Sequence, residues 1–319
     1  MQVIHGYKLI GELKTTNSGF SKWGFAEKGG IEFFIKELID PVYPIETKLL
    51  DPVMLEHKRK ICQEFENRNQ LLYRAINKCS DGNLVRIESF FRSGSHYYLV
   101  MEKVNGVKFG EVQTISFQDK ARICKALIHS LHVLHQQGIV HADIKMDNIL
   151  FRRLPSGSIT GKIIDFDNSF WESQPPSPEE EIRGDPVYMA PETFKMMQNE
   201  EGYIDRAIDV FALGLVIHQI LDGKLPEFDR NRYDYPFEAV LDHAELICSR
   251  SVPEEWRQII IGMIQAERSV RLSLEDANRF WRSGREPSEL IWSGNWKKTE
   301  EKAEAASVKQ SFLSPAGDL

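Results

Sequence analysis

Cysteine is scarce in this sequence, and the few cysteines present are not clustered. The 319 residues include four cysteines, at positions 62, 79, 124 and 248, and no two of them form a CxxC motif. Zinc sites and thiol redox motifs use closely spaced cysteines, so neither is expected. The wide spacing instead favours reduced thiols in a cytoplasmic protein.

Long apolar runs are also missing, and so is the pattern of a secretion signal. No apolar stretch approaches the roughly 20 residues that a helix needs to cross a bilayer. The N-terminal segment MQVIHGYKLIG lacks the charged and then apolar layout of a signal peptide. We therefore expect a cytoplasmic protein that does not insert into a membrane.

Basic residues are not in excess. Lys and Arg number 40 against 47 Asp and Glu, which gives a formal net charge of −7. Proteins that bind nucleic acid or anionic membranes need a basic face, so neither partner is expected. With 42% apolar residues, the chain can bury a core in one large domain or in two lobes. The sequence leaves the oligomeric state open.

Strand patterns dominate the first hundred residues. Segment 7–14 alternates, and segment 31–38 is rich in β-formers and follows a Gly29-Gly30 turn. Segments 83–91 and 96–104 predict two further strands joined by the turn RSGS. This part of the chain is therefore expected to form a β-rich region.

Helical patterns supply the rest. Residues 53–78 predict a charged helix with one apolar face, formed by Ile61, Phe65, Leu72 and Ile76. Residues 119–138 predict an amphipathic helix, and residues 205–221 are apolar nearly all round, as in a buried helix. A small β-rich region followed by a larger helical one indicates a bilobal ligand-binding fold.

Three motifs carry a resemblance to a known family. HADIKMDNIL (141–150), DFD (165–167) and GDPVYMAPE (184–192) resemble the catalytic loop, the D-F-G motif and the end of the activation segment of protein kinases. Their order and spacing match the family, and the resemblance covers roughly residues 7–283. It implies an α+β, bilobal protein-kinase-like fold of the divergent eukaryotic-like type. The expected parts are a small β-rich N-lobe (1–104), a larger helical C-lobe (105–284) and a flexible tail (285–319).

The resemblance implies a set of residues for phosphoryl transfer. Asp143 would meet the incoming hydroxyl, and Lys145 would stabilise charge on the transferring group, as in the Ser/Thr-specific kinases. Asn148 and Asp165 would hold Mg²⁺, which prefers hard oxygen ligands. Lys36 in FFIKE matches the strand lysine that binds the phosphates of ATP.

The remaining ATP-binding positions follow from the same resemblance. The hinge that hydrogen-bonds adenine would include Met101, Glu102 and Val104, and Leu150 would lie beneath the base. A glutamate should pair with Lys36, and both Glu64 and Glu66 are candidates. We favour Glu66, although a solvated charged helix face explains either residue nearly as well.

Other matched positions serve the architecture. His141 and Phe166 would stack in an internal apolar column. Asp209 would brace the catalytic loop, and Glu192 would form an ion pair with Arg271.

The sequence departs from the family pattern around the nucleotide. The three glycine positions of the phosphate loop are Thr16, Ser18 and Ser21, and only Gly19 remains, off register. Small hydroxyl residues such as Ser18 partly substitute, because they too let backbone N–H groups approach phosphate. Above the adenine, Trp23 and Phe34 replace a valine and an alanine. Two such rings either stack on adenine or fill its space, and we favour stacking.

Two further departures concern control. Ala142 replaces the arginine that usually binds a phosphorylated activation loop, so this switch should be missing. Asp167 replaces the glycine of D-F-G and adds a carboxylate near the expected metal site.

These residues predict an ATP- and Mg²⁺-dependent serine/threonine protein kinase that acts on protein substrates. One alternative is a pseudokinase scaffold with weak or no nucleotide turnover. The two large aromatic residues above the adenine position, Trp23 and Phe34, and the altered glycine loop favour this alternative. A less favoured alternative is a small-molecule kinase. Such enzymes lack the segment YMAPE, which shapes a platform for peptides.

Overall fold

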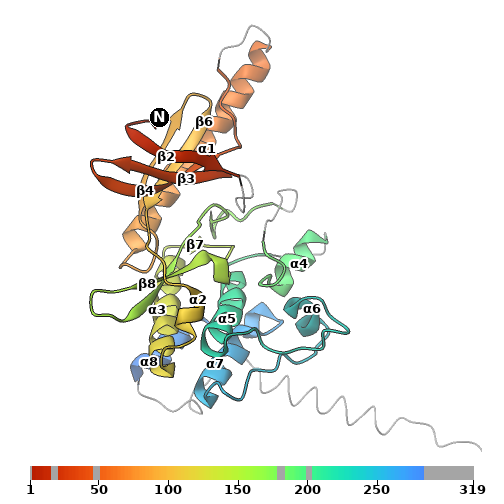
Figure 1. Ribbon diagram of the computed structural model, residues 1–319. Helices are drawn as coiled ribbons and strands as arrows, with labels where there is room; N and C mark the ends of the chain where they lie inside the picture. The colour runs from red at the N-terminus through yellow and green to blue at the C-terminus, as the bar shows by residue number, and fades with distance from the viewer. Residues whose placement is uncertain (1, 16–20, 46–50, 178–183, 199–202, 284–319) are drawn as a thin grey trace, which may run out of the picture. The chain divides into compact units, whose positions relative to one another are not determined.

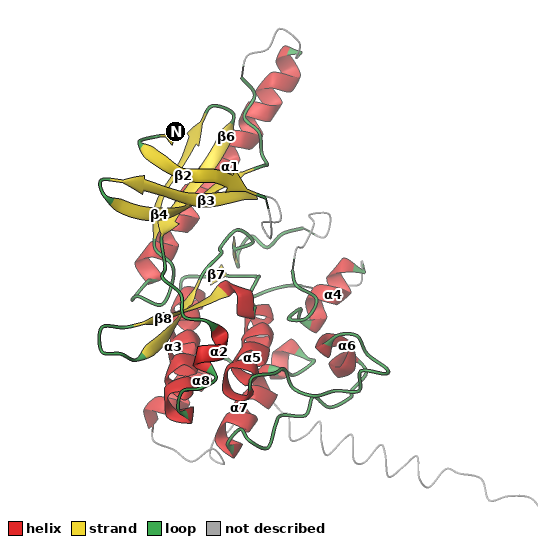
Figure 2. Ribbon diagram, in the orientation of Figure 1, coloured by secondary structure: helices red, strands yellow, loops and turns green. Residues whose placement is uncertain are grey.

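The chain forms two compact units. The computed structural model describes residues 2–15, 21–45, 51–177, 184–198 and 203–283. The first unit consists of residues 1–141 and 146–175, and the second of residues 142–145 and 176–319. Figures 1 and 2 show the course of the chain and its helices and strands. Within the described ranges, no helix is long and apolar enough to cross a membrane.

An antiparallel sheet begins the first unit, with its strands in the order β1-β2-β3-β4-β6-β5. The strands are β1 (Val3–Ile4), β2 (Tyr7–Lys14), β3 (Ser21–Lys28), β4 (Ile31–Leu38), β5 (Ile87–Ser93) and β6 (His96–Glu102). The four predicted strands are confirmed as β2, β4, β5 and β6, but β5 begins at Ile87 rather than at residue 83 and includes the first two residues of the predicted turn. Strands β1 and β3 were not predicted. Gly29 and Gly30 join β3 to β4 with φ of 62° and 79°, as a two-residue type I′ hairpin turn requires.

Helix α1 (Pro52–Cys79) packs against β5 and against α3 (Phe117–Gln136). The helix predicted here is confirmed, but its predicted apolar face is wrong at Ile61, which is 45% exposed. The neighbouring Cys62 is buried instead, because a free cysteine packs as a small apolar residue. The buried side chains of α1 are Cys62, Leu72, Tyr73, Ile76 and Cys79.

A helix packed on a hairpin follows in the first unit. Strand β8 (Ile149–Arg153) pairs with β9 (Ile159–Ile163), and α3 packs on β9. Gly161 allows close contact, because a Cβ there would lie 3.0 Å from Leu127 Cδ2. The unit also contains α2 (Phe109–Val112), β7 (Ile139–Val140), the 3₁₀ turn η1 (Met146–Asn148) and β10 (Phe170–Trp171).

Helix α5 (Ala207–Asp222) is the buried centre of the second unit. Every residue from Ile208 to His218 is buried, which confirms the buried helix predicted from the sequence. At Gly214 a Cβ would lie 2.8 Å from Ile264 Cγ2, so the packing requires glycine. The other helices of this unit are α4 (Pro191–Met197), α6 (Pro236–Leu241), α7 (Glu254–Met263), η2 (Arg268–Val270) and α8 (Leu274–Ser283).

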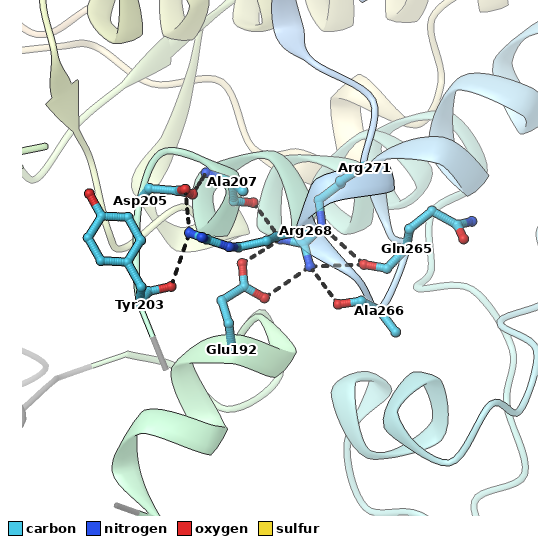
Figure 3. A network of polar contacts seen from close by, with 8 residues as sticks. All are labelled: Glu192, Tyr203, Asp205, Ala207, Gln265, Ala266, Arg268 and Arg271. Atoms are coloured by element: carbon cyan, nitrogen blue, oxygen red, sulfur yellow. Dashed lines mark hydrogen bonds and ion pairs between the residues drawn. The ribbon is translucent and has the colours of Figure 1, made fainter. Parts of the chain in front are cut away.

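Arg271 joins several segments of the second unit (Figure 3). Its Nη1 donates to Glu192 Oε1 at 2.6 Å, and its Nη2 donates to Glu192 Oε2 at 3.0 Å. The predicted ion pair is therefore confirmed as a bidentate one, the strongest form of this contact. The guanidinium also donates to the carbonyl oxygens of Ala207, Gln265 and Ala266.

All four cysteines are free and buried. Burial raises the pKa of the Cys248 thiol to about 11 and also raises the pKa of Cys79 and of Cys124. Buried thiols of this kind are structural and unreactive.

His218 bridges two loops from within α5. Its Nε2 accepts a hydrogen bond from Ser249 N at 3.0 Å, so Nδ1 carries the proton and donates to Lys224 O at 2.7 Å. A protonated ring has no acceptor nitrogen, so only neutral His218 makes both bonds. Burial lowers the pKa of His218, in agreement with these contacts.

We expect His218 to make the protein less stable as the pH falls from about 7.5 to about 5.5. A histidine whose pKa is lower in the folded protein takes up a proton on unfolding, so its contribution is lost below the unfolded pKa of about 6.5. Thermal unfolding across this range should therefore depend less on pH in His218→Gln than in the native protein. His57→Gln, which changes an exposed histidine of α1, is the control. Equal pH dependence in native and His218→Gln protein would contradict this role.

Candidate active site

One face of β3 and β4 carries aromatic rings and a lysine. Alternation along β4 places Phe34 and Lys36 on the same face, and the strand register sets Trp23 opposite Lys36. The half-buried rings of Trp23 and Phe34 stack, with centroids 5.7 Å apart and planes inclined by 20°. Phe25, which the sequence did not point to, meets both rings edge-on. Trp23 and Phe34, the two residues predicted to lie above the adenine, therefore form an aromatic surface beside Lys36.

Lys36 contacts two carboxylates of the segment that follows β9. Its Nζ lies 2.7 Å from Asp165 Oδ1 and 2.8 Å from Asp167 Oδ2. The Lys36 side chain is only 10% exposed, whereas the two aspartate side chains are 33% and 31% exposed. We call these three residues the Lys36 cluster. The contact with Asp167 was not predicted from the sequence.

Burial and close charges act in opposite directions on the pKa values of this cluster. Burial alone would lower the pKa of Lys36, but the Asp167 and Asp165 carboxylates outweigh burial and raise it. Burial alone would raise the pKa of Asp165, but the Lys36 ammonium lowers it. For Asp167, burial raises the pKa to about 6 against the effect of Lys36, and the Asp165 carboxylate adds to the rise. Asp165 is thus the carboxylate that the lysine holds ionised.

The glutamate expected to pair with Lys36 has other partners. Glu66 Oε1 accepts a hydrogen bond from Tyr97 Oη at 2.8 Å and lies 3.5 Å from Arg92 Nε. Glu64 is exposed beside Lys60. Among the described residues, neither glutamate contacts Lys36, whose ammonium instead donates to Asp165 and Asp167.

A buried lysine outside the predicted set anchors the end of β6. Lys162 on β9 is 3% exposed, and its Nζ donates to Glu102 Oε1 at 2.6 Å. The same carboxylate oxygen accepts from Arg86 N at 2.7 Å. Lys162 also donates to Leu84 O at 3.3 Å. This network fixes the end of β6, where Glu102 lies, to the strand that leads to Asp165.

The other described residues predicted to contact the nucleotide lie on or next to strands of the first unit. Met101 is buried in β6 and pairs with Phe34 in the strand register. Leu150 lies on β8 and pairs with Lys162. The adenine-binding roles of Met101, Glu102, Val104 and Leu150 stay predictions. Ser18 and Gly19 of the expected phosphate loop lie outside the described residues.

Backbone contacts tie Asn148 to the segment that carries Asp165. Asn148 O accepts a hydrogen bond from Ile164 N at 3.0 Å, and His141 Nε2 lies 3.0 Å from Ile164 O. The rings of His141 and Phe166 are in contact, with centroids 4.8 Å apart, but their planes are tilted by 58° rather than stacked as predicted. The two hydrogen bonds fix the backbone of Ile164, directly before Asp165, and the ring contact holds the side chain of Phe166, directly after it.

In the second unit, Asp143 and Lys145 form an ion pair, with Nζ 3.0 Å from Oδ2. The preceding Ala142 donates its backbone N–H to Asp209 Oδ1 at 2.8 Å, which confirms that Asp209 braces this loop. Ala142 has φ of 64° and Asp165 has φ of 65°. Residues with side chains rarely adopt this left-handed conformation, which costs about 1 kcal/mol or more and is concentrated at functional sites.

The donor chemistry fits a hard divalent cation. Asp165 and Asp167 present carboxylate oxygens, and the side-chain oxygen of Asn148 is also a hard ligand, all of which suit Mg²⁺. Within the described residues, no three His, Cys, Asp or Glu side chains gather to hold a metal ion alone. Magnesium usually keeps few protein ligands and completes its shell with water and substrate phosphates.

Comparisons with known proteins point to one family. The family model described as "Protein kinase domain" matches residues 56–280, more than half of the chain. The chain is 27% identical over 201 residues to Calcium-dependent protein kinase 4 of Plasmodium falciparum, covering 61% of this chain and 37% of that protein. It is 30% identical over 199 residues to Serine/threonine-protein kinase DCLK3 of Mus musculus, covering 58% and 22%. The chain therefore spans less than half the length of these relatives.

A solved structure shares the fold. The Cydia pomonella Granulovirus kinase PK-1 matches with a TM-score of 0.58 and 19% identity, covering 86% of this chain and 92% of that one. Together with the β-rich sheet of the first unit and the helical second unit, this match confirms the predicted fold class.

Replacing Lys162 by methionine should lower the free energy of unfolding by about 3 kcal/mol, because it leaves a partly buried carboxylate at Glu102 without its cation. Urea unfolding measures the change. Lys60→Met is the matched control, since Lys60 pairs with Glu64 at a site where both side chains are exposed. It should cost less than about 1 kcal/mol. Equal losses in the two variants would show that the buried pair is unimportant.

Proposed function

Because the chain belongs to the protein kinase domain family, we propose that it transfers the γ-phosphate of ATP to serine or threonine hydroxyls of protein substrates. The observation that carries this proposal is the contact between Lys36 Nζ and Asp165 Oδ1, which joins residues 129 positions apart. In phosphoryl transfer, the phosphate-binding lysine and the metal-binding aspartate act on the same nucleotide. Their contact supports one shared nucleotide site.

Asp143 and Lys145 supply the groups that act at the reacting atoms. The Asp143 carboxylate accepts a hydrogen bond from the substrate hydroxyl, orients its oxygen and takes its proton. Lys145 Nζ contacts Asp143 Oδ2. Its remaining N–H donors are available to stabilise charge on the transferring phosphoryl group.

Asn148, Asp165 and Lys36 bind the nucleotide end of the reaction. Asn148 and Asp165 hold Mg²⁺, which when bound neutralises negative charge on the phosphate oxygens. Lys36 donates hydrogen bonds to the phosphates, once its ammonium is free to do so. Trp23 and Phe34 offer a stacking surface for the adenine ring.

The pseudokinase alternative rests on two observations in the first unit. Trp23 and Phe34 already stack on each other, and the Lys36 ammonium is held by two carboxylates. Both arrangements would leave ATP weakly bound. Against this alternative, the ion pair of Asp143 with Lys145 and the brace from Asp209 keep the groups for transfer in place. The ion pair of Glu192 with Arg271, which anchors the APE segment, likewise disfavours a small-molecule kinase.

Removing either reacting carboxylate should abolish transfer. We expect Asp143→Asn and Asp165→Asn each to reduce the rate by about 10³-fold or more, equivalent to roughly 4 kcal/mol in the barrier. The assay measures incorporation of radiolabelled phosphate from ATP and Mg²⁺ into the protein itself or an added substrate. Asp147→Asn removes an exposed carboxylate of η1 and should retain near-native activity. Near-native transfer in Asp143→Asn or Asp165→Asn would show that the assignment is wrong.

The aromatic surface predicts how nucleotide binding responds to Phe34. Under the kinase proposal, MgATP at about 100 times its Kd stabilises the native protein by about 2.7 kcal/mol, which raises Tm by several degrees. Phe34→Ala should weaken this response, because it removes a stacking ring. The control is Mg²⁺ alone. No shift in the native protein, together with a shift restored in Phe34→Ala, would favour the pseudokinase alternative.

A further inference from the structure

The Lys36 cluster shares one ammonium between two carboxylates. Lys36 Nζ donates a hydrogen bond to each member of this pair, at 2.7 Å to Asp165 and 2.8 Å to Asp167. An ammonium has three N–H donors, so two of them are committed within the protein. The lysine side chain is nearly enclosed, whereas about a third of each aspartate side chain faces solvent.

The position of Glu66 makes Asp167 the notable partner. Tyr97 and Arg92 occupy Glu66, so this glutamate does not compete for Lys36. Asp165 belongs to the expected metal site, but Asp167 stands at a position where the family pattern has a glycine, which has no side chain. The second carboxylate on Lys36 is therefore a property of this sequence.

We propose that Asp167 positions Lys36 against Asp165 in the nucleotide-free protein, withholding its ammonium from phosphate until a divalent cation binds the two carboxylates. This inference rests on the proposed function, since it assumes that the site takes a magnesium nucleotide. Asp167 is a positioning residue here, because it acts through Lys36.

The electrostatics of the cluster give the mechanism of release. A divalent cation at Asp165 and Asp167 occupies the oxygens that hold the ammonium and repels the ammonium itself. Cation binding and lysine release therefore favour each other, and by linkage each strengthens the other to the same extent. Native protein should consequently bind nucleotide poorly without a divalent cation and much better with one.

Binding of a fluorescent ADP analogue, in EDTA and in saturating Mg²⁺, tests the proposal without relying on turnover. In EDTA, Asp167→Asn should bind about tenfold tighter than native protein, as expected when a charge-assisted hydrogen bond no longer holds the lysine. In Mg²⁺ this advantage should disappear, because the cation has already released Lys36 from the native cluster. Asp147→Asn, which removes one exposed carboxylate outside the Lys36 cluster, should match native protein in both conditions.

A double-mutant cycle separates this role from simple charge repulsion. If Asp167 acts through Lys36, Asp167→Asn should change affinity in EDTA by less than about twofold in a Lys36→Met background. If Asp167 merely repels phosphate, the tenfold gain should persist in that background and should also persist in Mg²⁺. Either persistence overturns the proposal.

Thermal unfolding of the same four proteins tests the cluster without any nucleotide. The change in Tm caused by Asp167→Asn should be more favourable in the Lys36→Met background, where the substitution only relieves repulsion between two carboxylates, than in the native background, where it also loses an ion pair with Lys36. An equal change in both backgrounds would overturn the proposal. If no variant binds nucleotide in either condition but the two changes differ, the proposed function fails and the cluster stands.

Discussion

Lys36 lies between the carboxylates of Asp165 and Asp167, and this contact requires two parts of the first unit to form correctly. Lys36 comes from β4, in the middle of the sheet between β3 and β6. Asp165 follows β9, whose place is set by the hairpin with β8 and by α3 packed against Gly161. Lys162 links the same strand to Glu102 at the end of β6. These partly buried ion pairs therefore help to specify where hairpin and sheet meet, in addition to apolar packing.

Much of this fold follows from patterns in the sequence, and the exceptions have physical causes. The all-round apolarity of residues 205–221 predicts the buried α5, because a helix in a core has no solvent side. The alternation in β2 and the Gly29-Gly30 turn likewise predict the hairpin region. The predicted apolar face of α1 is wrong at Ile61, because isoleucine is the more hydrophobic residue type but the neighbouring Cys62 fills the buried position. One residue changes the direction of a helical side chain by about 100°.

Some contacts of the candidate site could be predicted from the sequence, and others could not. Contacts that hold a motif in its local conformation were predictable, such as Asp209 with the loop before Asp143, and Glu192 with Arg271. The partners of Lys36 could not be predicted, because they depend on which of several Asp and Glu side chains reaches its ammonium in the folded chain. Lys162 was missed although a lysine within the β-forming segment ITGKII (159–164) is a signal, since a lysine that becomes buried needs an anionic partner.

The backbone conformation of Ala142 bears on the choice between the proposed kinase and the pseudokinase alternative. Its φ of 64° is a conformation that glycine adopts without strain and alanine does not. In the family pattern this position holds an arginine that binds a phosphorylated activation loop, and alanine cannot make that contact. The conformation nevertheless aims the Ala142 N–H at Asp209 Oδ1, one residue before Asp143. Asp165 shows the same φ region, and there the carboxylate holds Lys36. Of the four described residues other than glycine with positive φ, these two adjoin or carry a carboxylate of the set proposed for transfer, whereas His5 and His243 do not. The strain at Ala142 and at Asp165 therefore supports, each within its own unit, the roles proposed for Asp143 and Asp165.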